Sequence, residues 1–204
     1  ERLLELHNVV SEGIHKVGDI EERVDSLFFA LMNPEDKKDI ESEKAESFQA
    51  RIQYNRISYV LDTETEVNIY HSIFGNKIDE YFLPGVLENF AKVVVSSRMN
   101  VHCETLKEWI PNLNNYEKYC DKDGLLLRMV IYSGVIPTWL SDEDKKKFTA
   151  DIRKRLISEA EHEGQQGFSG RDSIRLFSDF FSSRAQSRRL INMSDMTEYF
   201  KHGI

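Results

Sequence analysis

A continuous apolar segment, residues 27–32 with the sequence LFFALM, constrains the fold of this chain more than any other feature. It ends abruptly at Asn33 and Pro34, and proline lacks the N–H group that a strand ladder needs. A short apolar run without alternation is typical of a strand buried on both faces of a parallel sheet. We therefore predict a strand over residues 26–32. Such a strand needs neighbours on both edges, and the chain offers few further candidates, chiefly residues 52–60, so the polypeptide is expected to be a piece of a larger α/β protein.

The hydrophobic period becomes helical after residue 61. The predicted fold class is mainly α, with a short α/β segment over residues 1–60 followed by an all-helical region over residues 61–204. Acidic or hydroxyl residues stand where several of these helices would begin, as capping and the helix dipole favour. Helices are expected over about residues 2–12, 63–74, 78–99, 104–109, 124–132, 141–163 and 171–184, and after Ser194.

Composition excludes several classes of function. The net charge of −8 makes nucleic acid an unlikely partner, because phosphate binding needs a basic surface. No apolar run is long enough to cross a membrane, and the N-terminus lacks the character of a signal peptide. We expect a cytoplasmic protein in which Cys103 and Cys120 are free thiols. No metal site is predicted, since the histidines are scattered and consecutive helical residues such as Glu161 and His162 point in different directions.

Three polar positions could carry chemistry. Asn33 stands at the end of the predicted strand, where ligands of open α/β sheets bind. Arg51 precedes the second strand candidate, and its planar guanidinium could reach a neighbour's nucleotide phosphate. Ser169 can cap a helix that carries Arg171 in its first turn, which favours anion binding. Taken singly, each has an ordinary explanation: an Asn-Pro turn, a surface arginine and a capped helix start.

In their order along the chain these positions resemble the sensor-1, arginine-finger and sensor-2 elements of the AAA+ ATPases. Within that superfamily the chain most resembles the bacterial PrkA-type serine protein kinases. No single motif is specific to this family. The resemblance is specific because of the order of the motifs along the chain. The segments that carry the resemblance are residues 4–13, 27–33, 48–52, 60–70, 87–98, 129–132 and 167–175.

The resemblance implies a role for each position. Asn33 would be the sensor-1 residue that helps to position the attacking water, and Arg51 the arginine finger that acts across a homo-oligomer interface. Arg171 would be the sensor-2 arginine, with Arg175 as the alternative. Residues 1–60 would then end the ATPase core, and residues 61–204 would form its helical lid.

The resemblance also implies cofactors and partners. ATP and Mg²⁺ would bind the intact parent, but the chain contains no GxxxxGK[ST] phosphate loop, so neither cofactor is expected on this fragment alone. A protein substrate is possible, because the family name implies kinase activity on serine. The intact parent is expected to be an ATP-dependent enzyme, either a serine protein kinase or a remodelling ATPase, and the fragment alone is expected to be inactive. The competing interpretation is a helical protein–protein interaction module without nucleotide chemistry.

Overall fold

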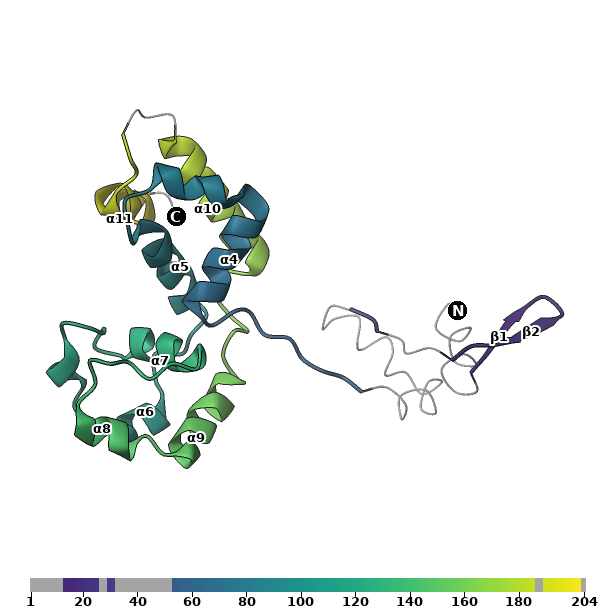
Figure 1. Cartoon of the computed structure of the whole chain (residues 1–204), viewed down its shortest axis with the longest axis horizontal. Coiled ribbons are helices and arrows are strands. Elements are labelled where there is room, and N and C mark those ends of the chain that lie inside the picture. Colours follow the sequence, from purple (N-terminus) through teal and green to yellow (C-terminus); the bar gives the residue numbers. More distant parts are fainter. Residues whose placement is uncertain (1–12, 26–28, 32–52, 186–188, 203–204) are drawn as a thin grey trace. The chain divides into compact units, whose positions relative to one another are not determined.

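The structure is a computed structural model, and it describes residues 13–25, 29–31, 53–185 and 189–202. The chain divides into two compact units, Glu1–Arg56 and Ile57–Ile204 (Figure 1). Helices dominate the described residues, which confirms the predicted mainly α fold class. The helix predicted over residues 2–12 lies outside the described part of the chain.

The described part of the first unit contains an antiparallel hairpin of β1 (Ile14–Val17) and β2 (Ile20–Arg23). Val17 pairs with Ile20, so the loop is the two residues Gly18 and Asp19. Gly18 adopts a φ of 62°, the left-handed conformation that tight hairpin turns require. The available sequence signal for this hairpin was the Gly18-Asp19 pair, which is flanked by the β-branched residues Val17 and Ile20. The hairpin was not among the predicted elements.

Neither predicted strand is present in the described residues. Residues 29–31 lie outside regular structure, with Phe29 89% and Leu31 91% exposed, so the prediction of a buried strand is wrong there. Residues 53–60 likewise belong to no sheet. A doubly buried strand derives its stability from neighbouring strands, and the β1–β2 hairpin is the one sheet within the described ranges.

In the second unit the helices largely follow the predicted positions, although the stretch expected to be helical over residues 78–99 forms a 3-10 helix and a separate α-helix that begins at Val86. The expected helix over residues 141–163 is divided in two, because Phe148 leaves helical geometry and the Thr149 hydroxyl caps a new helix by accepting the Ile152 N–H at 3.3 Å. The elements are α4 (Thr63–Phe74), η2 (Asn76–Tyr81), α5 (Val86–Ser96), α6 (Glu104–Trp109), η3 (Leu113–Tyr116), α7 (Leu125–Tyr132), α8 (Asp142–Lys147), α9 (Ala150–Ala160), α10 (Gly170–Arg184) and α11 (Met193–His202).

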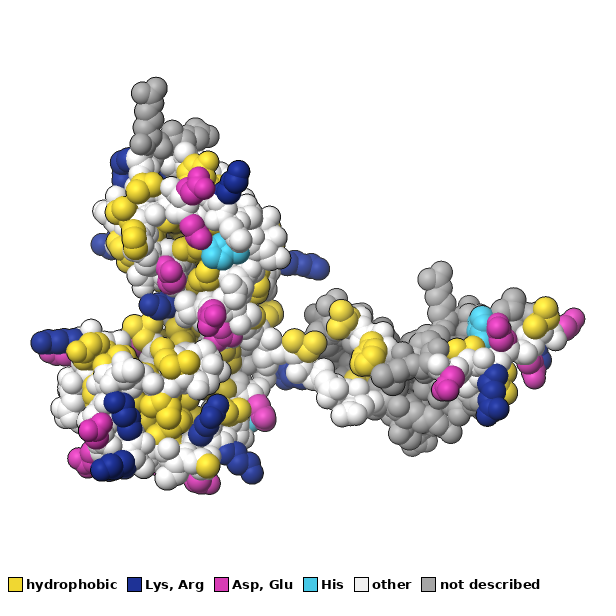
Figure 2. All heavy atoms as spheres, viewed as in Figure 1, with side chains coloured by type: hydrophobic (Ala, Val, Ile, Leu, Met, Phe, Trp, Pro, Cys, Tyr) yellow, Lys and Arg dark blue, Asp and Glu magenta, His cyan; other side chains and the backbone are white. Residues whose placement is uncertain are grey.

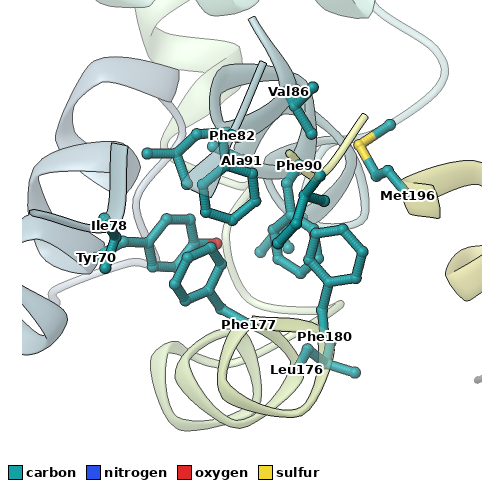
Figure 3. Packing of buried hydrophobic residues seen from close by; sticks show 13 residues of the cluster. Tyr70, Ile78, Phe82, Val86, Phe90, Ala91, Leu176, Phe177, Phe180 and Met196 are labelled. Atoms are coloured by element: carbon teal, nitrogen blue, oxygen red, sulfur yellow. The ribbon is translucent and has the colours of Figure 1, made fainter. Parts of the chain in front are cut away.

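An aromatic core joins α4, α5, α10 and α11, and its rings converge in Figure 3. Tyr70 stacks on Phe177 with ring centroids 4.4 Å apart. Phe90 stacks on Phe180 at 5.2 Å. Phe177 and Phe180 of α10 are buried in this core, whereas Phe181 is only partly buried.

A second core joins α6, α7 and α9 around the fully buried Trp109. Its indole N–H donates to the Asp144 carbonyl at 2.8 Å. Cys103 and Cys120 are buried in this core as free thiols, and burial raises the pKa of Cys103 to about 11, which keeps it an unreactive thiol. A small cluster with Val95 of α5 and Met129 of α7 connects the two cores.

Helix α11 begins with an ionic cap. The Asn192 side chain accepts the Asp195 N–H at 3.2 Å, and the Asp195 carboxylate accepts the Asn192 N–H at 3.0 Å. Arg189 donates to the same carboxylate through Nη2 at 2.6 Å. The Arg189 guanidinium, together with the Asn192 N–H, holds the pKa of Asp195 below its ordinary value although the residue is buried.

Replacing Phe90 with alanine is expected to destabilise the chain by about 3–5 kcal/mol, the range for deleting a fully buried aromatic ring. Ile73 lies on α4 with half of its surface exposed, so Ile73→Ala should cost less than about 1 kcal/mol. Urea unfolding of both variants measures the difference. Equal costs would contradict the assignment of Phe90 to the core.

Asp195 should make the stability of the chain depend on pH in the acid range. Its folded pKa lies below that of the unfolded chain, so it contributes stability above about pH 4 that is lost as the pH falls toward the folded value. Asp195→Asn is expected to flatten the unfolding free energy below about pH 5. Urea titrations from neutral to acid pH measure this, with Asp179→Asn, an exposed change on α10, as the control. Identical pH profiles for wild type and Asp195→Asn would count against the ionic cap.

Candidate functional site

Helix α10 begins with a complete capping box. The Ser169 hydroxyl accepts the Asp172 N–H at 3.1 Å, and the Asp172 carboxylate accepts the Ser169 N–H at 3.2 Å. The hydrogen bonds from Ser169 hold the pKa of Asp172 below its ordinary value. Ser169 is therefore the cap that the sequence predicted. The charged Asp172 carboxylate nevertheless competes with any bound anion for the positive end of the helix.

The two arginines predicted to sense phosphate, Arg171 and Arg175, lie four residues apart on α10, a spacing that puts them on one helix face. Both are exposed. Arg175 Nη2 lies 3.1 Å from Asp172 Oδ1, so part of its charge is already paired. Within the described ranges, Arg171 forms no ion pair. The structure thus distinguishes two arginines that the sequence left as alternatives.

The other two candidates, Asn33 and Arg51, lie outside the described residues. The structure neither brings them to α10 nor separates them from it. Their roles at a nucleotide stay predictions.

Behind the first turn of α10 lies a buried ion pair between Arg98, two residues beyond the end of α5, and Glu66 of α4. Arg98 Nη1 donates to Glu66 Oε2 at 2.7 Å and Nη2 to Oε1 at 3.2 Å, the two-point geometry that suits a guanidinium and a carboxylate. Both side chains are almost completely buried. Two further bonds satisfy the guanidinium, from Nε to the Phe168 carbonyl at 2.7 Å and from Nη1 to the Val60 carbonyl at 2.9 Å.

Glu66 extends this network to α10 itself. Its Oε1 accepts hydrogen bonds from the hydroxyls of Tyr70 and Ser173, and these two hydroxyls lie 2.8 Å apart. Burial, followed by the neighbouring Glu66 charge, raises the pKa of Tyr70, so the phenol stays protonated and can donate. One buried carboxylate therefore links α4, the end of α5 and the first turn of α10.

Two glycines allow the backbone segments around Arg98 to touch. A Cβ at Gly167 would lie 2.1 Å from the Ser97 carbonyl oxygen, and one at Gly164 would lie 2.9 Å from the Tyr59 carbonyl oxygen. Both residues also have positive φ angles, 78° and 67°. The helix predicted over residues 141–163 ends directly before Gly164. The structure adds that these glycines permit contacts which no other residue would allow.

A second buried pair joins Arg128 of α7 and Glu163, and here the Arg128 Nε has no hydrogen-bond partner among the described residues. Arg128 Nη1 lies 2.5 Å from Glu163 Oε1, and Nη2 donates to the Asn100 carbonyl. The Tyr132 hydroxyl donates to Glu163 Oε2 at 3.1 Å. Glu163, the neighbour of His162, is thus a structural anion.

The sequence did not identify Arg98, Glu66, Arg128 or Glu163 as buried. Arg98 stands at the end of a segment that resembles the family, and Glu66 lies in the first turn of α4, which Asp62 caps by accepting the Thr65 N–H at 2.7 Å. A basic residue directly after the apolar stretch VVVSS was the available signal. Pairing partners 32 and 35 residues apart cannot be recognised from spacing.

Two further features concern what the site could bind. Among the described residues, no group of His, Cys, Asp and Glu side chains is arranged to hold a metal ion. No helix of the described part is long and apolar enough to cross a bilayer. On the face seen in Figure 2, basic and acidic side chains are interspersed over the helical unit.

Gly167→Ala should destabilise the chain by about 2 kcal/mol or more, because a Cβ there meets backbone and the φ angle is strained. Gly170 provides the matched control: it opens α10, and a Cβ added there would meet nothing within 4 Å. Gly170→Ala should be neutral or stabilise by about 0.4–1 kcal/mol. Thermal and urea unfolding measure both, and a milder effect at Gly167 than at Gly170 would contradict the close approach.

Residues 126–204 match the family model for the PrkA serine protein kinase C-terminal domain. The matched region begins within α7 and includes Arg171 and Arg175, whereas Glu66 and Arg98 precede it. Among curated proteins and solved structures, none matches the chain. This match supports the resemblance predicted from the sequence: residues 126–204 are similar to the C-terminal domain of the PrkA serine protein kinases.

Proposed function

We propose that this chain is part of an ATP-dependent, PrkA-like serine protein kinase of the AAA+ superfamily, in which α10 carries a nucleotide-sensing arginine. The match of residues 126–204 to the PrkA C-terminal domain is the observation that carries this proposal. The phosphate loop and the Mg²⁺ ligands would belong to other parts of the parent, since residues 1–204 contain no GxxxxGK[ST] segment. ATP and Mg²⁺ would bind there, with no nucleotide held by this chain alone.

Arg171 is the better candidate for the sensing role. A guanidinium already paired with a carboxylate must give up that interaction before it can bind phosphate, which favours Arg171 over the Asp172-paired Arg175. The buried Ser173–Glu66 contact two residues further along α10 gives the helix start a fixed support. Arg171 would then contact the nucleotide phosphates of its own subunit.

The remaining predicted roles complete the proposal. Asn33 would help to position the attacking water, and Arg51 would reach the nucleotide of a neighbouring subunit in a homo-oligomer. A serine-containing protein would be the phosphate acceptor, in keeping with the family name. The alternative is a helical interaction module that binds a partner protein without nucleotide chemistry.

Arg171→Ala in the complete parent protein should weaken ATP binding or slow its turnover by roughly tenfold to a hundredfold, the effect of losing one hydrogen bond to a charged group. Arg175→Ala should have a smaller effect on ATP binding and turnover, because the Arg175 guanidinium is already paired with the Asp172 carboxylate. Titration with Mg·ATP and with Mg·ADP, together with phosphate release, measures these effects. A larger loss for ATP than for ADP would place Arg171 at the terminal phosphate.

The matched control is Lys154→Ala, which removes an exposed positive charge on α9. If Arg171→Ala leaves both affinity and turnover at the level of this control, the sensing role is rejected and the interaction module is favoured. If Arg175→Ala has the larger effect, the assignment of the two arginines is reversed.

A further inference from the structure

Three chain segments that are distant in sequence meet at Arg98. They are the connector, defined as residues 57–62 immediately before α4, the end of α5, and residues 164–168 immediately before α10. The Tyr59 N–H donates to the Gly164 carbonyl at 3.0 Å, and the Gly164 N–H donates to the Arg98 carbonyl at 2.9 Å. The Phe168 N–H donates to the Ser97 hydroxyl at 3.1 Å. Two backbone–backbone bonds and one bond to a side-chain hydroxyl thus connect the three segments.

The Arg98 guanidinium closes this series. It donates to the Val60 carbonyl in the connector and to the Phe168 carbonyl, which directly precedes the α10 cap. Its central carbon also lies 5.8 Å from the centre of the Tyr59 ring, within the range of a cation–π contact. The connector and the start of α10 therefore share one rigid, planar group.

Neither end of this arrangement can shift freely. Movement of the connector would remove an acceptor from a buried guanidinium, and an unsatisfied buried charge is costly. Movement of Phe168 would do the same, and Gly167 already lies against the Ser97 backbone without room for a side chain. If the backbone of one segment moves, the hydrogen bonds of the Arg98 guanidinium are therefore kept most easily when the other segment moves as well.

We infer that Arg98 is a positioning residue that couples the connector to the first turn of α10, so that a change in the backbone at residues 58–60 changes the stability of the α10 start. The connector follows directly after the first unit in the sequence, and α10 carries Arg171 two residues after its Ser169 cap. The coupling concerns the helix whether or not Arg171 binds nucleotide, so it can hold if the proposed function fails.

The test compares Arg98→Lys with Arg128→Lys in the full chain, by residue-resolved amide hydrogen exchange. A lysine can still pair with Glu66, but it cannot also donate to the carbonyls of Val60 and Phe168. Arg98→Lys should raise exchange at the amides of Tyr59, Phe168 and Ser173 by roughly tenfold or more beyond any global change, as loss of a charge-assisted bond predicts. Arg128→Lys, at an equally buried pair, should instead affect the Asn100 amide, which Glu163 accepts at 3.0 Å. The same pattern in both variants would overturn the inference.

A change in the connector itself provides the second test. Tyr59→Ala should raise exchange at Phe168 and Ser173 in the wild-type background and add little in the Arg98→Lys background, because the coupling is already lost. Tyr119 is a partly exposed tyrosine stacked on Trp139 in the other core, so Tyr119→Ala is the matched control and should leave these amides unchanged. If Tyr59→Ala leaves Phe168 and Ser173 unaffected in a folded chain, Arg98 is only a local support and the coupling is excluded. This test remains decisive if Arg98→Lys does not fold.

Discussion

The buried pair of Arg98 and Glu66 is the interaction on which the arrangement around α10 depends. Taking both charges out of water is costly, and their attraction compensates only when every remaining donor and acceptor is also satisfied. Here the Phe168 and Val60 carbonyls complete the guanidinium, and Ser173 completes the carboxylate. The desolvation cost therefore favours a packing of these segments that satisfies both ions.

Both cores of the helical unit contain a buried ion pair, although the Arg128 Nε lacks a hydrogen-bond partner among the described residues. Each combines an aromatic or aliphatic interior with one fully buried arginine–glutamate pair, and in each the arginine also bonds to a backbone carbonyl outside regular structure. Apolar burial supplies most of the stability but has little direction. The ion pairs supply direction, and they fix loops such as residues 164–168 that have few apolar side chains of their own.

Periodicity and capping chemistry predicted the helical elements well. The stripe around Phe90, the break at Gly75 and the Ser169 cap each depend on residues a few positions apart, so the sequence contains the information. The division of the helix at Thr149 was missed because an apolar period continues across it. The strand over residues 26–32 was predicted from a local run alone, although its burial depends on neighbours that the described residues do not provide.

The sequence by itself determined the mainly α class, the places where most helices begin and end, and the family resemblance, because all of these follow from local order along the chain. It also marked Arg171 and Arg175 as candidates without separating them. Only the tertiary structure decided that Arg98 and Glu66 are internal and paired with each other. The physical reason is that pairing between buried charges depends on which segments meet in space, and no spacing rule in the sequence encodes a contact between residues so far apart.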